Sequence, residues 1–265
     1  MKKIVLKSFL LMALVSCTTA PISGQKSLIL TSEKDEVSMG EQAFQEILKK
    51  EKKSTNAAQV AQIDQIAKRL VAVAGRPDYK WEMVTLENPA PNAFCLPGGK
   101  MATYTGILKY AENESALAAV VGHEIGHALA RHGGQRISQN ILLTGALVGA
   151  GATALSQNKN KDMIMAGLGV VATTAIVLPF SRSNESEADE IGLVLMARAG
   201  YDPREAPLFW DRMGKAGGGK APPEFLSTHP ASSTRKKHLE ELLPNAIEIY
   251  NRAPQKYGKG DKLIY

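Results

Sequence analysis

The sequence predicts an α+β fold that is predominantly helical and contains one small antiparallel sheet. The chain has 265 residues, of which 44% are hydrophobic and 22% are charged, an ordinary globular composition that allows a sizeable core. Apolar residues recur at helical spacing in several segments. Residues 79–105 are instead rich in aromatic, β-branched and turn residues, which is typical of short strands.

The N-terminus, MKKIVLKSFLLMALVSC, has the pattern of a secretory signal peptide. Three lysines precede an apolar run, Phe9–Val15, that is too short to cross a bilayer. Leu14 to Cys17 resembles the lipobox of bacterial lipoproteins, which implies cleavage before Cys17 and lipid on its thiol. The alternative is a plain signal peptide with an incidental cysteine. We assign residues 1–16 to a lipoprotein signal peptide and the polar residues 17–37 to a lipid-anchored tether.

Cleavage at this site changes the charge of the mature chain. Residues 1–16 hold three lysines and no acidic residue, so the formal net charge of +6 becomes +3, and no nucleic-acid partner is predicted. If Cys17 carries lipid, Cys95 has no partner for an intramolecular disulfide. Thr18 follows Cys17, which favours the outer membrane by resemblance to lipoprotein sorting in Gram-negative bacteria. We expect a lipid-anchored protein of the bacterial cell envelope that faces the periplasm.

Residues 38–265 are predicted to form the functional domain. Amphipathic helices are expected over 39–53 and 56–74, the second ending at Gly75. A strand is expected within 79–87, and strands over Asn92–Leu96 and Lys100–Thr105 are expected to pair across the turn at 97–99.

A helix with Asn113 or Ser115 as its N-cap follows, and Gly133-Gly134 is expected to end it. Residues 141–180 form an apolar insertion, whose many glycines and alanines favour two closely packed helices. A hairpin that dips into the membrane is the alternative. Further helices are predicted over 183–199, 203–213 and 231–243.

The segment VVGHEIGHALARH carries the candidate chemistry. His123 and His127 are four residues apart, so on a helix they project from one face and can reach one zinc ion. Glu124 is placed to take a proton from a metal-activated water. The alternative is a core helix with two buried histidines.

A catalytic zinc needs a third protein ligand and an open fourth position. Gly133 stands where the metzincin pattern has its third histidine, which excludes that class. On a continuous helix His132 points away from the metal face, so we interpret it as a structural or surface histidine. Glu185 is the better candidate, because a carboxylate from a second helix would complete a His-His-Glu set. Asp189, one turn later, could accept a hydrogen bond from a ligand histidine, and Glu187 is expected to point elsewhere.

These segments together resemble peptidase family M48, the group of the HtpX-like membrane proteases, the prenyl-protein proteases and periplasmic lipoprotein relatives. The resemblance runs from Glu41 to Leu243 and rests on NAFCLPGGKMATYTGIL, VVGHEIGHALARH, SRSNESEADEIG and STHP…R. It implies a zincin-type (gluzincin) metalloprotease domain of the lipoprotein branch, with the small sheet at the active-site cleft. It also implies one zinc per chain held by His123, His127 and Glu185. Glu124 is then the general base, and Asp189 is the hydrogen-bond partner of a ligand histidine.

The resemblance gives roles to two further segments. Asn92, Ala93 and Phe94 match an edge strand that lines the cleft and can bind an extended peptide through main-chain hydrogen bonds. We interpret Cys95 beside it as a small, inert thiol. His229 matches a histidine near the metal, where it stabilises the oxyanion or fills the fourth zinc position in a latent state. Arg235 follows at the family's spacing.

The sequence therefore predicts a zinc metalloendopeptidase that cleaves misfolded or stalled envelope proteins with metal-activated water. Its partners are unfolded or misassembled envelope proteins as substrates and the membrane through the N-terminal lipid. The alternative is a lipoprotein chaperone or assembly factor with a latent zinc site. A zinc hydrolase of cell-wall peptides is the less favoured enzyme.

Overall fold

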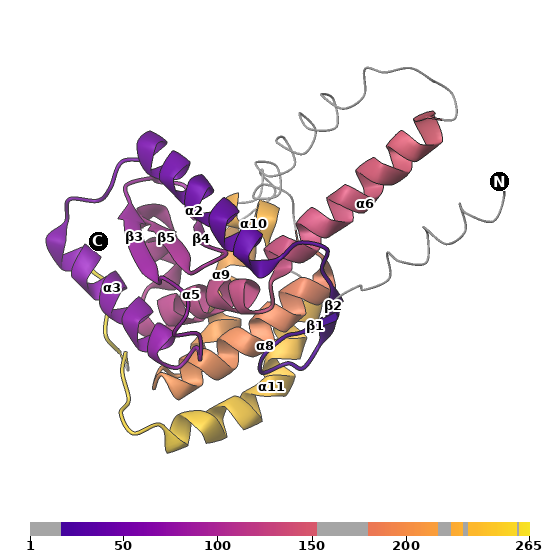
Figure 1. The fold of residues 1–265 in the computed structure, drawn as a ribbon. Helices are drawn as coiled ribbons and strands as arrows, with labels where there is room; N and C mark the ends of the chain where they lie inside the picture. Colours follow the sequence, from indigo (N-terminus) through magenta and orange to yellow (C-terminus); the bar gives the residue numbers. More distant parts are fainter. Residues whose placement is uncertain (1–16, 153–179, 217–223, 230–232, 259) are drawn as a thin grey trace, which may run out of the picture.

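The computed structural model describes residues 17–152, 180–216, 224–229, 233–258 and 260–265. The predicted signal peptide and most of the predicted apolar insertion lie outside these residues. The described part is mostly helical with two small sheets, and the predicted predominantly helical α+β fold is confirmed (Figure 1). Within this part, no helix combines the length and hydropathy that crossing a bilayer requires.

The centre of the fold is the pair α5 (Glu114–Leu129) and α8 (Arg182–Arg198), which pack against each other. Asn113 caps α5 by accepting a hydrogen bond from the amide of Ala116, as its sequence predicts. The helices approach closely because glycines stand at the contact. A Cβ on Gly126 would lie 2.8 Å from the carbonyl oxygen of Ala188, and one on Gly192 would lie 2.7 Å from the amide nitrogen of His123.

Three strands form a sheet in the order β3 (Glu82–Leu86), β5 (Lys100–Tyr104) and β4 (Ala93–Leu96). β4 pairs antiparallel with β5, as expected, but β3 pairs parallel with β5, so the sheet is mixed and not wholly antiparallel. The parallel pairing arises because residues 87–92 cross over and leave β4 at the sheet edge. β4 packs against α5, which places this edge beside the predicted site.

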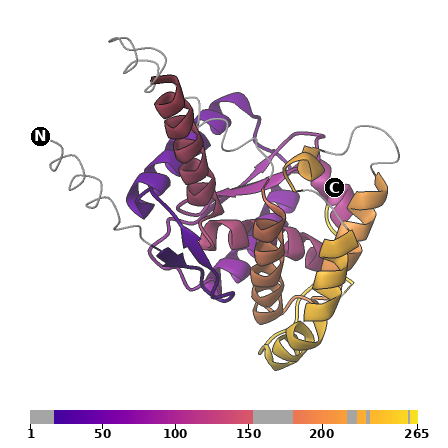
Figure 2. The same ribbon diagram turned by 90° about the vertical axis from the view of Figure 1, so that its right-hand side faces the viewer.

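Two helices precede the sheet, and further helical elements surround the central pair. α2 (Glu33–Lys50) begins six residues earlier than predicted, because Ser32 caps it by accepting from the amide of Asp35. α3 (Ala57–Ala72) begins at Asn56 as its cap. The remaining elements are η1 (Thr105–Ile107), α4 (Leu108–Ala111), α9 (Glu205–Ala216), α10 (Glu224–Thr228) and α11 (Ser233–Arg252). α11 runs alongside α8, as the two views in Figures 1 and 2 show.

The segment assigned to the tether contains a β-hairpin that contacts the domain. β1 (Cys17–Thr19) pairs antiparallel with β2 (Lys26–Leu28). The amide of Leu30 donates to the hydroxyl of Ser138 on α6 (His132–Ala152), at 2.8 Å. α6 extends away from the body of the molecule (Figure 1).

Gly133 and Gly134 lie inside the first turn of α6 and do not end a helical region, contrary to the sequence prediction. α5 ends instead at Leu129, and Arg131 then adopts a left-handed conformation with φ 54°. Gly134 instead leaves room for Glu36, because a Cβ at this position would lie within 2.2 Å of a carboxylate oxygen of Glu36.

Candidate metal centre

His123 and His127 project from the same face of α5 into the core. Both side chains are buried, and their Nε2 atoms lie 3.1 Å apart. The four-residue spacing produces this arrangement, because successive turns of a helix place such side chains one above the other.

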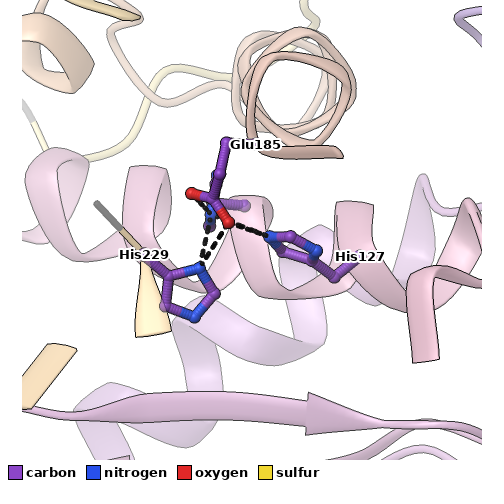
Figure 3. Close-up of side chains that lie close together, drawn as sticks. His127, Glu185 and His229 are labelled. Carbon is purple, nitrogen blue, oxygen red and sulfur yellow. Dashed lines mark hydrogen bonds and ion pairs between the residues drawn. The ribbon is translucent and has the colours of Figure 1, made fainter. Parts of the chain in front are cut away.

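Glu185 on α8 and His229, which follows α10, complete a buried cluster of four residues. Oε1 of Glu185 lies 3.3 Å from Nε2 of His127 and 3.0 Å from Nδ1 of His229. Figure 3 shows the carboxylate of Glu185 directed toward both of these imidazoles. Nδ1 of His229 is also 3.3 Å from Nε2 of His123. One ligand atom from each residue lies within 4.8 Å of all the others, and among the described residues this is the set identified as able to hold a metal ion.

The spacing of these atoms fits a zinc ion. Ligand atoms about 2.0–2.1 Å from a tetrahedral ion lie about 3.3–3.4 Å from one another. The contacts from His123 and His229 to their neighbours in the cluster and from His127 to Oε1 of Glu185 are 3.0–3.5 Å long, with Glu185 using Oε2 toward His123 and Oε1 toward the other two histidines. Nitrogen donors with one carboxylate oxygen are also a donor set that zinc accepts. Oε1 of the buried Glu124 has no hydrogen-bond partner within the described residues, as suits a group that acts on a bound molecule.

A carboxylate and a guanidinium lie behind the cluster. Oδ1 of Asp189 is 2.9 Å from Nδ1 of His123, where it can fix the ring so that Nε2 faces the cluster. Arg235 on α11 donates to both oxygens of Asp189, at 2.7 and 2.8 Å. Its Nη1 lies 2.7 Å from Oε2 of Glu185. From its offset after STHP, sequence reasoning associated Arg235 with substrate or loop contacts and did not foresee its ion pairs with Asp189 and Glu185.

Burial and charge shift the pKa values of the cluster in different directions. Burial lowers the pKa of His127 well below its usual value and raises that of Glu124. Burial alone would lower the pKa of His123, but the carboxylates of Asp189 and Glu185 raise it to about 9. Burial opposes ionisation of Glu185, yet His229 and the other two histidines hold its pKa well below the usual range. The site therefore keeps Glu185 as a charged carboxylate among imidazoles.

His132 and Glu187 lie on the other side of His127. Both are buried, so His132 is not a surface histidine, and it is not part of the four-residue cluster. Nδ1 of His132 is 2.8 Å from Nδ1 of His127, and Nε2 of His132 is 3.1 Å from Oε2 of Glu187. The sequence argument missed this contact because it assumed that the helix continues through residue 132.

The edge strand β4 packs against α5, the helix that carries Glu124 and both ligand histidines. The negative charge of Glu124 adds to burial in raising the pKa of the Cys95 thiol well above its usual value. This thiol is therefore protonated and poorly nucleophilic. Asn92 accepts at its main-chain oxygen from the amide of Tyr104, and its side chain accepts from the amide of Ala93. Phe94 is partly exposed on the same strand.

Comparison with known proteins gives a consistent result. The sequence model of "Peptidase family M48" matches residues 57–243, which contain all four residues of the cluster. The mitochondrial metalloendopeptidase OMA1 of Schizosaccharomyces pombe is 41% identical over 186 residues, covering 69% of this chain and 53% of that protein. The human mitochondrial metalloendopeptidase OMA1 is 29% identical over 87% of this chain and 46% of its own length.

A bacterial relative is similar as well. The beta-barrel assembly-enhancing protease of Escherichia coli is 30% identical over 197 residues, covering 70% of this chain and 40% of that protein. The chain thus spans about half or less of the length of these three relatives.

Proposed function

Since this chain belongs to peptidase family M48, we propose that it is a zinc metalloendopeptidase whose active site is the cluster on α5 and α8. The observation that supports this best is the buried cluster in which Nε2 of His127 lies 3.1 Å from Nε2 of His123 and 3.3 Å from Oε1 of Glu185, separations close to those between ligands of a tetrahedral zinc ion. Oε1 of Glu124, which accepts no hydrogen bond from the described residues, lies 3.5 Å from Nε2 of His229 in the same cluster. The names of the relatives describe metalloendopeptidases and a protease.

His123, His127 and Glu185 would hold the zinc, with Asp189 and Arg235 fixing the first histidine and the carboxylate. Bound zinc supplies Lewis acid chemistry, which acidifies water and polarises a carbonyl. Glu124 accepts the proton of the attacking water and then delivers it to the leaving amine. Nε2 of His229 lies 3.5 Å from Oε1 of Glu124, and a donor near the general base would stabilise the oxyanion that forms during attack.

The substrate is an extended segment of an unfolded or misassembled envelope protein that adds to the edge of β4. Asn92, Ala93 and Phe94 offer this edge beside Glu124. Main-chain pairing selects little by sequence, which suits a protease that acts on damaged or stalled proteins.

Lipid on Cys17 anchors the protein at the outer membrane, facing the periplasm. Cys17 is the first residue of β1 and pairs with Leu28, so a lipid there begins directly at the folded domain. Leu28 and Leu30 are exposed on this hairpin, and Leu142 is exposed on the neighbouring α6. Mass spectrometry of the mature N-terminus tests this assignment, because an unmodified Cys17 would contradict it.

A second function is favoured by the position of His229, whose Nδ1 lies among the ligand atoms. A fourth protein ligand closes a zinc site, as in structural sites. In that arrangement the protein is an assembly factor with a latent site.

Two variants separate these functions. We expect Glu124→Gln to keep zinc and lose cleavage of an unfolded protein, because only proton transfer is removed. Retention of the cellular role by this variant would favour the assembly factor. His229→Ala should lower kcat and leave zinc affinity unchanged if His229 stabilises the transition state. Weaker zinc binding with higher activity would instead identify His229 as the latent fourth ligand.

A further inference from the structure

His127 lies at one end of a chain of buried polar contacts that leads away from the cluster. Its Nε2 faces the cluster, while its Nδ1 is 2.8 Å from Nδ1 of His132. Nε2 of His132 is 3.1 Å from Oε2 of Glu187, and the hydroxyl of Ser23 donates to Oε1 of Glu187 at 2.5 Å. The contributing segments are α5, the start of α6, α8 and the loop of the β1–β2 hairpin.

The chain turn between α5 and α6 brings His132 to this position. Arg131 is left-handed, and its guanidinium donates to both oxygens of the buried Glu36. Its Nη2 also donates to the carbonyl of Thr31. These contacts hold a non-glycine residue in a left-handed conformation that such residues rarely adopt. The turn directs His132 back toward His127.

If His127 binds a metal ion through Nε2, only one arrangement of protons satisfies the hydrogen bonds between these groups. A neutral His127 that binds metal through Nε2 carries its proton on Nδ1, and this N–H needs an acceptor. The acceptor available at 2.8 Å is Nδ1 of His132, which must then be unprotonated. His132 therefore carries its proton on Nε2 and donates it to Glu187. Glu187 is acceptor-only, which also fits the hydroxyl of Ser23 as a donor.

We propose that His132 and Glu187 are positioning residues for the metal ligand His127, which they hold in the tautomer and orientation that present Nε2 to zinc. This inference rests on the proposed zinc site. His132 would then orient His127 in the way that Asp189, which contacts the far nitrogen of His123, orients that histidine. The far nitrogen of His123 is thus contacted by Asp189 of α8, and that of His127 by His132 at the start of α6.

His127, His132 and Glu187 are buried from water, which makes their polar contacts strong and the loss of these contacts costly. Phe180 stacks on His127 with 4.0 Å between the ring centres, and the guanidinium of Arg136 lies 3.5 Å from the centre of the Phe180 ring. Glu187 is only 2% exposed. Burial of a carboxylate costs free energy unless hydrogen-bond donors satisfy its oxygens, and His132 is such a donor here.

The experiment measures the zinc affinity of the purified full chain by competition with a chelator. We expect His132→Phe to weaken zinc binding about 10- to 100-fold, the usual effect of removing a group that orients a metal-ligating histidine. His132→Asn should restore much of the affinity, because its amide oxygen takes the place of Nδ1 and accepts from His127. His238→Phe on α11 is the matched control, since His238 lies outside the cluster, and it should bind zinc as the wild type does.

Two further variants test the proposal in case His132→Phe does not fold. Glu187→Gln keeps the shape of the side chain and should weaken zinc binding less than His132→Phe, and Ser23→Ala should weaken it least. Thermal unfolding in a chelator checks that each variant is folded. Equal zinc affinity in the wild type, His132→Phe and Glu187→Gln would overturn this inference and leave the proposed zinc site intact. A wild type that binds no zinc would overturn both.

Discussion

Replacing Gly192 by alanine tests whether the close approach of α5 and α8 builds the metal site. The new Cβ would lie 2.7 Å from the amide nitrogen of His123 and 2.9 Å from the carbonyl carbon of Gly122, whereas ordinary contacts begin at 3.4 Å. The helices must therefore separate by roughly 0.7 Å, because these are main-chain atoms that cannot rotate away.

This separation opposes the gain that alanine brings to a helix. Alanine favours a helix interior over glycine by up to about 1 kcal/mol, while overpacking of a core costs about 1–3 kcal/mol or more. After the helix-propensity gain is subtracted, we expect Gly192→Ala to be destabilised by about 1–2 kcal/mol, which lowers Tm by roughly 2–8 °C in a domain of this size. Because metal ligands must stay within about 0.5 Å of their positions, zinc affinity should fall as well.

The matched control is Gly214→Ala on α9, where a new Cβ meets nothing within 4 Å. This variant gains the same helix propensity without the clash, so its Tm should equal or exceed that of the wild type. Calorimetry in a chelator measures stability apart from metal binding, and chelator competition measures zinc affinity. The reasoning is refuted if Gly192→Ala is as stable as Gly214→Ala and binds zinc like the wild type.

Three further predictions concern single side chains. Metal analysis of Glu185→Ala should show loss of most of the zinc that the wild type carries, because one of three ligands is removed, and full retention would contradict the assignment. Arg235→Met should lower the free energy of unfolding by about 3–5 kcal/mol, measured by denaturant titration, since it leaves the buried Asp189 without its bidentate partner. Cys95→Ser should leave proteolytic activity within about twofold of the wild type, because the Cys95 thiol is protonated and lacks a catalytic role; inactivation of the variant would show otherwise.

Local patterns in the sequence were enough to predict most elements near the site. The strands over Asn92–Leu96 and Lys100–Thr105 were predicted within a residue of their observed bounds, and Asn113 was one of two predicted caps for the helix that follows. The i,i+4 spacing of the histidines placed both imidazoles on one face. These features depend on hydrogen bonds and periodicities within a few residues, which a sequence displays directly.

Features that depend on the tertiary fold were not predicted. The β1–β2 hairpin has strands of only three residues, which carry no periodicity to detect. The left-handed Arg131 is stabilised by Glu36, which is 95 residues away in the chain. Without that turn, His132 would follow the helix and point away from His127, as the sequence argument assumed.

Small residues recur at the contact between α5 and α8. Gly122 and Gly126 are four residues apart on α5, and Ala188 and Gly192 are four apart on α8. Gly122 faces Gly192, and Gly126 faces Ala188. Residues at this spacing form one ridge of a helix, and ridges of small residues let two main chains come close together.

The two motifs therefore specify packing as well as chemistry. Gly126 lies inside HEIGH, so one of the residues between the ligand histidines also forms the close contact with the second helix. Glu185 precedes Ala188 by three residues, one turn of α8, and reaches the histidines because this contact is close. A histidine pair on a helix without such a ridge would keep α8, and with it the carboxylate, farther away. Packing of small residues is thus a physical condition for the third ligand.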